Sequence, residues 1–240
     1  MSKNNIQIID AGLRLYQEVL RLQEELFNKN IDAKQKGEAT YHYLILCEHP
    51  PVFTLGKSGK RENILVSDAD LHAEFYHVNR GGDVTFHGPG QLVAYPILDL
   101  DNLHIGLAQY IFNIEETIIQ SLKPYQLTGE RIEDAAGIWL RNDKSTPHDR
   151  KIGAIGVKAS RNITMHGLAF NVDTDLTYFD KIVPCGLEGK GVTSLQKELN
   201  RPVSFEEYKI NFLDAFYGVF NASPVTAKAT FTPPFSWQAS

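Results

Sequence analysis

Residues 151–171 read KIGAIGVKASRNITMHGLAFN, two apolar runs rich in small residues on either side of a short polar turn. The runs Lys151–Ala159 and Ile163–Val172 have the length and composition of strands. The turn Ser160-Arg161-Asn162 is too short for the crossover that parallel strands need. The stretch therefore predicts an antiparallel hairpin, and with it a sheet that is not wholly parallel.

Helices and short strands are expected on both sides of this hairpin in the sequence. Further strands are expected at Tyr43–Cys47, Val52–Leu55, Asn63–Val66, Leu92–Leu98 and Ile138–Leu140, and helices at Asp10 to about Asn28, Leu107–Leu122 and Phe205–Phe220. Two segments, Thr193–Gln196 and Ser204–Glu207, have the spacing of a helix-capping box. This order of elements favours an α+β fold with a mixed or antiparallel sheet over regular βαβ winding.

No repeat or flexible linker divides the chain, so residues 1–240 are expected to form a single domain. Pro224, Pro233 and Pro234 predict an irregular C-terminal tail from about residue 223 to residue 240.

Composition excludes several classes of protein. With 24 Lys and Arg against 29 Asp and Glu the net charge is −5, which argues against a protein that coats nucleic acid. The longest apolar run, residues 92–98, is far shorter than the roughly 20 residues of a membrane helix. The N-terminus has no apolar segment typical of a secretion signal, so a cytoplasmic location is expected. No His-Glu-x-x-His or Cys-x-x-Cys motif is present, so no metal site is expected.

The segment RGGDVTFHGPGQ, residues 80–91, is the densest local signal. Glycines placed this closely cost backbone entropy on folding, and they are typical of positive φ angles or of close approach to a ligand. The N–H groups of Gly81 and Gly82 could hold a carbonyl or phosphate, with Arg80 adding charge. A hairpin with glycine turns explains the composition equally well.

The two cysteines have different surroundings. Cys47 ends an apolar strand and is expected to pack in the core. Cys185 stands in Val183-Pro184-Cys185-Gly186, where its sulfur could react if a nearby cation holds it as thiolate, although such a turn can also be purely structural. Lys151 could supply that cation from a distance of about 4 Å, but the sequence alone does not show that the two meet.

Taken together, several segments resemble the octanoyltransferases of lipoate synthesis, which transfer octanoyl from acyl carrier protein to a lysine of a lipoyl domain. The matching segments, in family order, are residues 48–56 (EHPPVFTLG), 80–91, 151–156 (KIGAIG), 166–172 (HGLAFNV), 184–186 (PCG) and 191–195 (GVTSL). The resemblance implies one domain of the biotin/lipoate protein ligase fold, a mixed sheet with flanking helices.

The resemblance also implies roles for individual residues. Cys185 matches the nucleophile that carries the acyl group as a thioester, and Lys151 matches the lysine that favours its thiolate. The matched substrate-binding residues are Arg80, Gly81, Gly82, Asp83, Val84, Thr85, Phe86, His87, Ala154, Ile155, Gly156, Gly167, Leu168 and Ala169. Ile155 and Leu168 are expected to form walls of a slot for the acyl chain.

No cofactor is implied, since the acyl group arrives on the phosphopantetheine arm of acyl carrier protein. The implied acceptors are lipoyl domains of 2-oxoacid dehydrogenase E2 subunits and the glycine cleavage H protein, with neither nucleic acid nor membrane as a partner. The alternative is an ATP-dependent lipoate or biotin protein ligase on the same fold, against which the Pro-Cys-Gly segment argues.

Overall fold

The hairpin at residues 151–171 forms the centre of the main sheet. Strands β9 (Arg150–Ser160) and β10 (Ile163–Asn171) pair antiparallel along almost their whole length. Arg161 and Asn162 join them with φ angles of 51° and 59°, as a two-residue hairpin turn requires. The computed structural model of the chain describes residues 3–67, 70–133, 135–142, 147–183 and 190–226.

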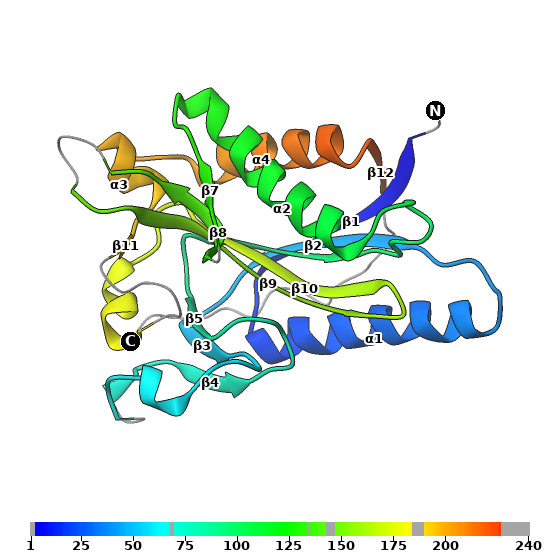
Figure 1. The fold of residues 1–240 in the computed structure, drawn as a ribbon, viewed down its shortest axis with the longest axis horizontal. Helices are drawn as coiled ribbons and strands as arrows, with labels where there is room; N and C mark the ends of the chain where they lie inside the picture. The colour runs from blue at the N-terminus through cyan, green and yellow to red at the C-terminus, as the bar shows by residue number, and fades with distance from the viewer. Residues whose placement is uncertain (1–2, 68–69, 134, 143–146, 184–189, 227–240) are drawn as a thin grey trace.

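Within those residues, nine strands form one mixed sheet in the order β12-β1-β2-β6-β10-β9-β8-β7, with β11 beside β9 (Figure 1). The other strands are β1 (Asn4–Leu13), β2 (His42–Glu48), β6 (Gln91–Ile97), β7 (Glu130–Ile132), β8 (Ala135–Leu140), β11 (Gly191–Val192) and β12 (Ala222–Thr226). The pairs β12–β1, β1–β2 and β11–β9 are parallel, and the remaining pairs are antiparallel.

A second, three-stranded sheet lies beside the first and carries the glycine-rich segment. It consists of β4 (Glu74–His77), β3 (Val52–Leu55) and β5 (Val84–His87), in that order. Short 3-10 turns, η1 (Arg61–Asn63), η3 (Lys123–Tyr125) and η4 (Leu176–Lys181), connect the larger elements. Of these, η4 packs on the small sheet, where the rings of Tyr178 and Phe86 stack with their centres 4.3 Å apart.

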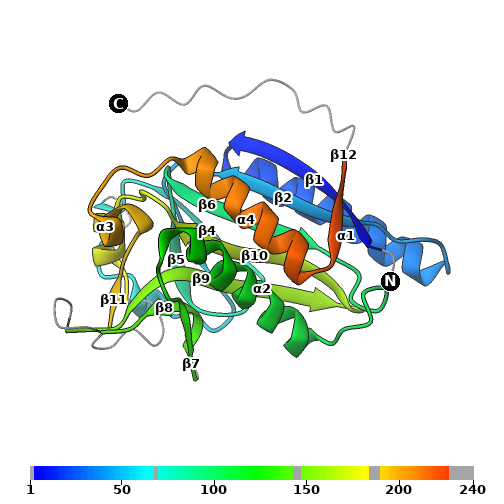
Figure 2. The ribbon, with the colours of Figure 1, turned by 90° about the horizontal axis from the view of Figure 1, so that it is seen from above.

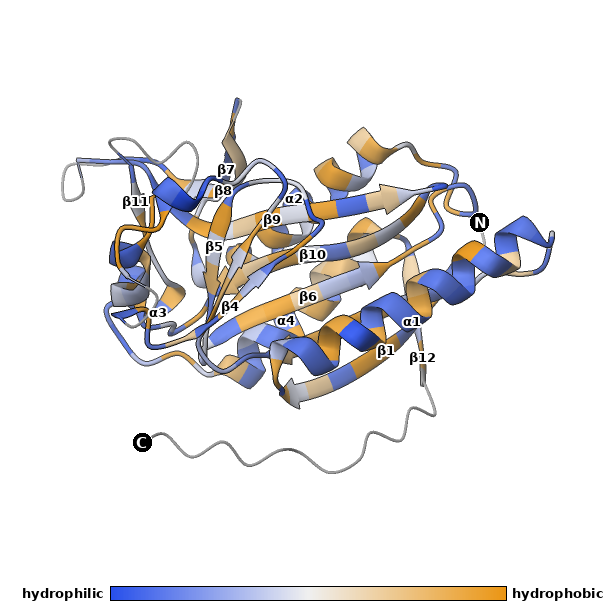
Figure 3. Ribbon diagram, turned by 90° about the horizontal axis from the view of Figure 1, so that it is seen from below, coloured by the Kyte–Doolittle hydropathy of each residue, from blue (hydrophilic) through white to orange (hydrophobic). Residues whose placement is uncertain are grey.

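Helices cover both faces of the main sheet. Helices α2 (Leu107–Leu122) and α4 (Phe205–Val219) lie side by side on one face, as Figure 2 shows, and the short α3 (Leu195–Leu199) follows β11. Helix α1 (Tyr16–Gln35) crosses the opposite face, and its surface is mostly hydrophilic on the outside (Figure 3). The small sheet lies on the same side as α1 (Figure 1).

The core under α2 follows from helical periodicity. Tyr110, Ile114, Ile118 and Leu122 recur every four residues, and none of them is exposed. Each such side chain contributes about 1.5–3 kcal/mol when fully buried. The helix predicted for Leu107–Leu122 and the α+β fold with a mixed sheet are therefore confirmed, but Leu107, which the predicted stripe included, is exposed.

The prediction for the N-terminal region is wrong in part. Residues 10–13 belong to strand β1, and the helix begins only at Tyr16 and continues to Gln35. A register shift beside Gly12, whose φ is +60°, breaks the apolar alternation of β1 and hides the strand in the sequence. Backbone pairing with the buried β2 then overrides local helix propensity.

Three smaller expectations are also corrected. Asn63–Val66 is not a strand, because Asn63 belongs to η1 and only an isolated bridge joins Ile64 to Ile182. The cap of α3 is Ser194 rather than Thr193. The irregular tail cannot start at residue 223, since residues 222–226 form β12, an edge strand that accommodates Pro224. Residues 227–240 lie outside the described part of the chain.

Candidate active site

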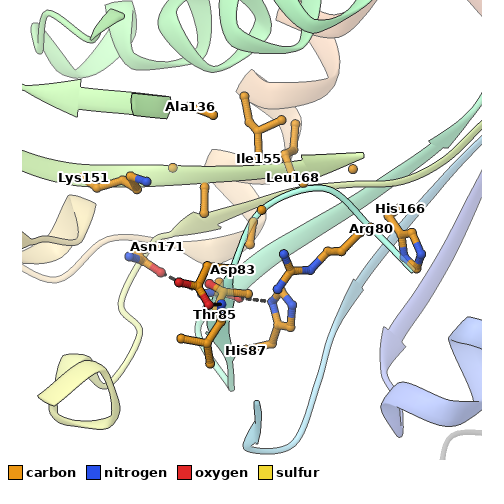
Figure 4. A pocket seen from close by; sticks show the side chains of 18 of the residues that line it. Arg80, Asp83, Thr85, His87, Ala136, Lys151, Ile155, His166, Leu168 and Asn171 are labelled. Carbon is orange, nitrogen blue, oxygen red and sulfur yellow. Dashed lines mark hydrogen bonds between the residues drawn. The ribbon is translucent and has the colours of Figure 1, made fainter. Parts of the chain in front are cut away.

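A cavity of about 300 Å³ opens between the small sheet and strands β9 and β10 of the main sheet (Figure 4). Residues of β5 and of the glycine-rich segment line one side. Residues of β9 and β10 line the other, and Phe179 of η4 and Val192 of β11 lie at its border. The cavity therefore lies where the two sheets meet, between segments that are far apart in the sequence.

Most of the residues predicted to bind substrate line this cavity. They are Arg80, Gly82, Asp83, Val84, Thr85, His87, Ala154, Ile155, Gly156, Gly167, Leu168 and Ala169. Two do not: Gly81 donates its N–H to the carbonyl of Val157, and Phe86 is buried in the core of the small sheet.

Of the two predicted catalytic residues, only Lys151 lies in the part of the chain that the structure describes. Lys151, at the start of β9, lines the cavity (Figure 4). Cys185 lies outside the described residues, so its distance from Lys151 stays a prediction.

Small residues form the part of the main sheet that faces the cavity. Gly156 lies opposite Gly167, and Ala154 lies opposite Ala169, in the two cross-strand pairs that flank the pair Ile155–Leu168. Gly167 has no room for a larger side chain, since a Cβ atom there would lie 2.1 Å from the carbonyl oxygen of Ala94. These pairs leave a smooth apolar surface on which an extended chain could lie.

Ile155 and Leu168 line the cavity, as the sequence predicts. Both also pack with the core beneath α2 and α4, and Figure 4 draws their side chains directed toward those helices. The small residues of the cavity wall come from the pairs on either side of them, Ala154–Ala169 and Gly156–Gly167.

Arg80 brings a buried positive charge to the cavity. One guanidinium nitrogen donates to both the carbonyl and the hydroxyl oxygen of Thr54, at 2.7 and 2.9 Å, and another donates to the carbonyl of Gly81 at 2.9 Å. Burial lowers the pKa of Arg80, although Tyr16 and other nearby groups oppose this. Among the described residues, no carboxylate forms an ion pair with it, so the charge is directed to whatever occupies the cavity.

A chain of side-chain amides holds His87, which lies on the same side of the cavity as Arg80. Asn171 donates to the carbonyl of Thr193 at 2.9 Å, and its own oxygen accepts from Gln91 at 2.8 Å. The oxygen of Gln91 lies 2.8 Å from Nδ1 of His87. Burial lowers the pKa of His87 to about 3, so its ring is neutral.

A second polar cluster lies beneath the cavity. His49 Nδ1 lies 2.8 Å from the carbonyl of Arg14, and its Nε2 lies 2.9 Å from the hydroxyl of Tyr95. Burial lowers the pKa of His49 to about 4, and burial raises the pKa of Tyr95. The edge of Tyr16 packs on the His49 ring with centres 5.2 Å apart.

His166 marks a strained position in β10. Its φ is +59°, an uncommon value for a residue other than glycine, and its ring lines the cavity. The backbone N–H of His166 donates to Gln23 of α1 at 3.1 Å. Burial lowers the pKa of His166 to about 3, helped by the positive charge of Arg80.

Sequence reasoning missed six lining residues that carry polar side-chain groups. They are Tyr16, Ser58, Gln91, Tyr95, His166 and Asn171. Gln91, His166 and Asn171 lie inside the glycine-containing segments 80–91 and 166–172, which the sequence analysis had already singled out. Their place in these segments could have indicated that they line the cavity. Tyr16 and Tyr95 carry no such signal, because only the packing of α1 and β6 brings them to the cavity.

Cys47 packs as expected. It is 2% exposed, and burial raises its pKa well above the ordinary value for a thiol. Its sulfur lies 3.4 Å from Nε2 of His49. Cys47 is therefore a core residue and not a nucleophile.

Metal-binding clusters and membrane-spanning helices are both absent from the described residues. No cluster of three or more His, Cys, Asp or Glu side chains has the arrangement of a metal site in that part of the chain. None of the helices there is both long and apolar enough to span a membrane.

Comparison with known proteins agrees with this architecture. Residues 15–217 match the family described as the lipoyl protein ligase A/B catalytic domain. An octanoyltransferase of Parabacteroides distasonis is 49% identical over 215 residues, which cover 88% of this chain and 96% of that protein. One of Cytophaga hutchinsonii is 47% identical over 234 residues, covering 92% and 96%.

Among solved structures, a bipartite lipoate protein ligase of Thermoplasma acidophilum superposes with a TM-score of 0.66 at 14% identity, over 96% of this chain and 88% of that one. The similarity at this identity concerns the fold alone, which is that of the lipoate protein ligases. With the family match and the close relatives, it places the present chain in the lipoyl protein ligase A/B catalytic-domain family, as an acyltransferase of the octanoyltransferase group.

Proposed function

We propose that this protein transfers an octanoyl group from acyl carrier protein to a lysine of a lipoyl domain, through a thioester on Cys185. The observation that carries the proposal is the cavity itself. It combines an apolar surface of small residues, a lysine at one end and a buried arginine, in a chain nearly half identical to octanoyltransferases.

The chain around Cys185 supports a place for its thiol at this cavity. Phe179 precedes the cysteine by six residues and Val192 follows it by seven, and both line the cavity. Val192 pairs directly with Lys151 across the β11–β9 ladder. On the other side, the N–H of Val183 donates to the carbonyl of Asn63 at 2.7 Å.

In the first step, the Cys185 thiolate attacks the carbonyl carbon of the octanoyl thioester on the carrier. A new bond forms between carbon and the cysteine sulfur, the bond to the pantetheine sulfur breaks, and that sulfur leaves as a thiolate that takes up a proton. One thioester replaces another, so the step needs no ATP. Backbone N–H groups near the cavity would stabilise the developing oxyanion, each contributing roughly 3–4 kcal/mol.

In the second step, the amine of the acceptor lysine attacks the acyl-cysteine. An amide forms, the cysteine sulfur leaves, and the amine must lose a proton. Lys151 in its neutral form accepts that proton, as a general base does. Amide formation from a thioester is downhill, which makes the transfer effectively one-way.

The proposed partners follow from this reaction. The donor is acyl carrier protein, and the acceptors are lipoyl domains of 2-oxoacid dehydrogenase E2 subunits and the glycine cleavage H protein. The acyl group arrives on the phosphopantetheine arm, so the enzyme requires no resident cofactor and no metal.

The test is intact mass spectrometry after mixing the enzyme with octanoyl carrier protein. We expect a gain of one octanoyl group on the wild type, none on Cys185→Ala, and loss of the added mass when a lipoyl domain is supplied. Cys47→Ala is the matched control and should still be acylated. Normal transfer by Cys185→Ala would rule out covalent catalysis by this residue. Transfer that needs free octanoate and ATP would instead favour a ligase.

A further inference from the structure

The cavity of the candidate site opens to solvent beside a short basic segment. Ser58 and Gly82 both line the cavity and are both exposed, so they lie at its mouth. The segment KSGKR, residues 57–61, contains three cations in five residues and no carboxylate. The side chains of Lys57 and Lys60 are exposed. The entrance therefore has a positively charged rim, in a chain whose net charge is −5.

Backbone contacts hold this basic segment against the glycine-rich segment. The N–H of Lys57 donates to the carbonyl of Arg80 at 3.0 Å, and the N–H of Ser58 donates to the carbonyl of Gly82 at 3.2 Å. The approach is close enough that only glycine fits at position 56, where a Cβ atom would lie 2.3 Å from the carbonyl oxygen of Gly82. The backbone that carries the lysines is thus fixed relative to the cavity.

The two lysines of this rim have no acidic partner in the part of the chain that the structure describes. Neither Lys57 nor Lys60 forms an ion pair with a carboxylate there. Lys34 of α1 shows the contrast, because its ammonium lies 2.6 Å from a carboxylate oxygen of Asp99 and 2.6 Å from one of Asp101. The charges of Lys57 and Lys60 are therefore available to a partner outside the chain.

Two carboxylates of adjoining segments do not neutralise this rim. Asp83 is buried, and its oxygens accept from the N–H of Val84 at 2.6 Å and from the side-chain amide of Asn63. Glu62 is exposed and offsets one cation, which leaves residues 57–62 with a net charge of +2. The rim stays positive after both are counted.

Two exposed aliphatic side chains lie beside the basic segment. An isolated bridge joins Ile64 to Ile182, which are both buried, and the N–H of Leu65 donates to the carbonyl of Lys181 at 2.9 Å. Successive side chains of an extended backbone alternate, so Leu65 and Val183 are directed outward. They are 58% and 39% exposed. Aliphatic groups next to unpaired cations match the mixed composition of a protein–protein interface.

The sign of the charge distinguishes between the two arms that the proposed reaction brings to this mouth. A phosphopantetheine arm carries a phosphodiester at its root and so brings negative charge. The side chain of an acceptor lysine carries an ammonium until it reacts and so brings positive charge. The lysines of the rim attract the first and repel the second. The rim therefore suits the donor better than the acceptor.

We propose that Lys57, Lys60 and Leu65 form the docking surface for an acyl carrier with an acidic face, which delivers the acyl group on its phosphopantetheine arm. The inference rests on the proposed function, in which the donor is a carrier protein. The two ammoniums attract the phosphodiester and the acidic side chains around it, and Leu65 adds an apolar contact. Attraction of this kind raises the rate of association and is weakened by salt.

The experiment measures kcat/KM for octanoyl carrier and, separately, for the lipoyl domain. In a transfer through an acyl-enzyme, each value reports only the step that its own partner takes. The double variant Lys57→Met, Lys60→Met should lower kcat/KM for the carrier about tenfold at low salt, since each exposed charge pair changes binding by roughly two- to fivefold. The value for the lipoyl domain should stay within about twofold. In about 1 M salt, where the Debye length is about 3 Å, the variant and the wild type should differ by less than about twofold.

Matched controls separate the docking surface from general surface effects. Lys29→Met removes an exposed lysine of α1 that does not line the cavity, and it should change neither value. Leu65→Ser should lower kcat/KM for the carrier about two- to fivefold at any salt concentration. Ile210→Ser, at a residue of α4 that is equally exposed at 58%, should leave it unchanged.

Octanoyl-pantetheine, which has neither phosphate nor protein, shows whether the cavity of the double variant is intact. The double variant should use this donor as well as the wild type does. An equal loss with both donors would overturn the proposal, because the lysines would then serve the chemistry. A fall for the lipoyl domain alone would overturn it in favour of an acceptor surface, and unchanged values would show a merely solvated rim. If the wild type takes octanoyl from neither donor, the proposed function itself fails, a result that needs no variant.

Discussion

Nδ1 of His87 lies 2.8 Å from the side-chain oxygen of Gln91, and this hydrogen bond determines which ring nitrogen of His87 carries a proton. The amide nitrogen of Gln91 donates to Asn171, so its oxygen is the atom that faces the imidazole. Asn171 is oriented in turn by the carbonyl of Thr193, which can only accept. Nδ1 of His87 is therefore the donor, and Nε2 remains an acceptor on a ring that lines the cavity.

Gln91→Met should break this chain while nearly preserving side-chain volume. His87 and Asn171 would each lose a buried partner, so we expect a loss of about 2–4 kcal/mol in the free energy of unfolding. Single-turnover acylation should slow more than tenfold, because the imidazole is no longer held in one tautomer. Urea unfolding and stopped-flow acylation measure the two effects. Gln109→Met, on the exposed surface of α2, is the control and should change neither.

Buried neutral histidines predict that stability falls in mild acid. Burial lowers the pKa values of His87 and His166 to about 3 and that of His49 to about 4, against about 6.5 in the unfolded chain. The unfolded state therefore binds more protons, and stability is lost as the pH falls from about 6.5 toward these values. Each histidine should contribute roughly 2 kcal/mol of loss between pH 7 and pH 5. Glu48 acts in the opposite direction, since burial raises its pKa.

The measurement is urea unfolding between pH 5 and pH 8. His49→Gln should have a shallower dependence on pH than the wild type, because one of the three groups no longer titrates. His104→Asn replaces an exposed histidine and should leave the slope unchanged. Equal slopes in His49→Gln and the wild type would show that His49 does not contribute to the loss of stability in acid.

Substitutions of different severity at Thr54 and Arg80 test what the buried guanidinium of Arg80 contributes to stability and activity. Thr54→Val removes only the hydroxyl acceptor and should cost about 1 kcal/mol of stability. Arg80→Lys cannot reproduce the fork of bonds to Thr54 and Gly81, so we expect a loss of about 2–4 kcal/mol and at least a tenfold fall in kcat/KM. Activity in Arg80→Lys that equals that of Thr54→Val would mean that the guanidinium geometry is unimportant.

The parts of the fold that the sequence predicts well are those with strong local patterns. Helix α2 has an apolar stripe that ends at Pro124, and the β9–β10 hairpin has a turn of the right length, so both are found at nearly their observed bounds. Strands β1 and β12 depend on pairing between residues more than 200 positions apart. No local pattern encodes such pairing, which is why these two were missed.

The same contrast between local sequence patterns and long-range packing applies to the candidate site. Residues 80–87 and 154–156 carry glycine-rich motifs, and most of them border the cavity. The hydroxyl of Tyr95 carries no motif. Its position depends on which face of a fully buried strand is directed to the site, and the composition of β6 is largely apolar on both faces.

The smooth surface formed by Ala154 and its partner Ala169 predicts how the enzyme selects acyl chains. Ala154→Leu would fill the space in which a chain lies, and each methylene kept out of the cavity loses about 0.8 kcal/mol, close to a fourfold change in rate. Transfer of octanoyl should fall at least tenfold, whereas transfer of butanoyl should change less than about threefold. Rates with a series of acyl carriers of increasing chain length measure the effect. Ala159→Leu, on the exposed end of the same strand, should leave the series unchanged. An equal fall for all chain lengths in Ala154→Leu would place the acyl chain elsewhere.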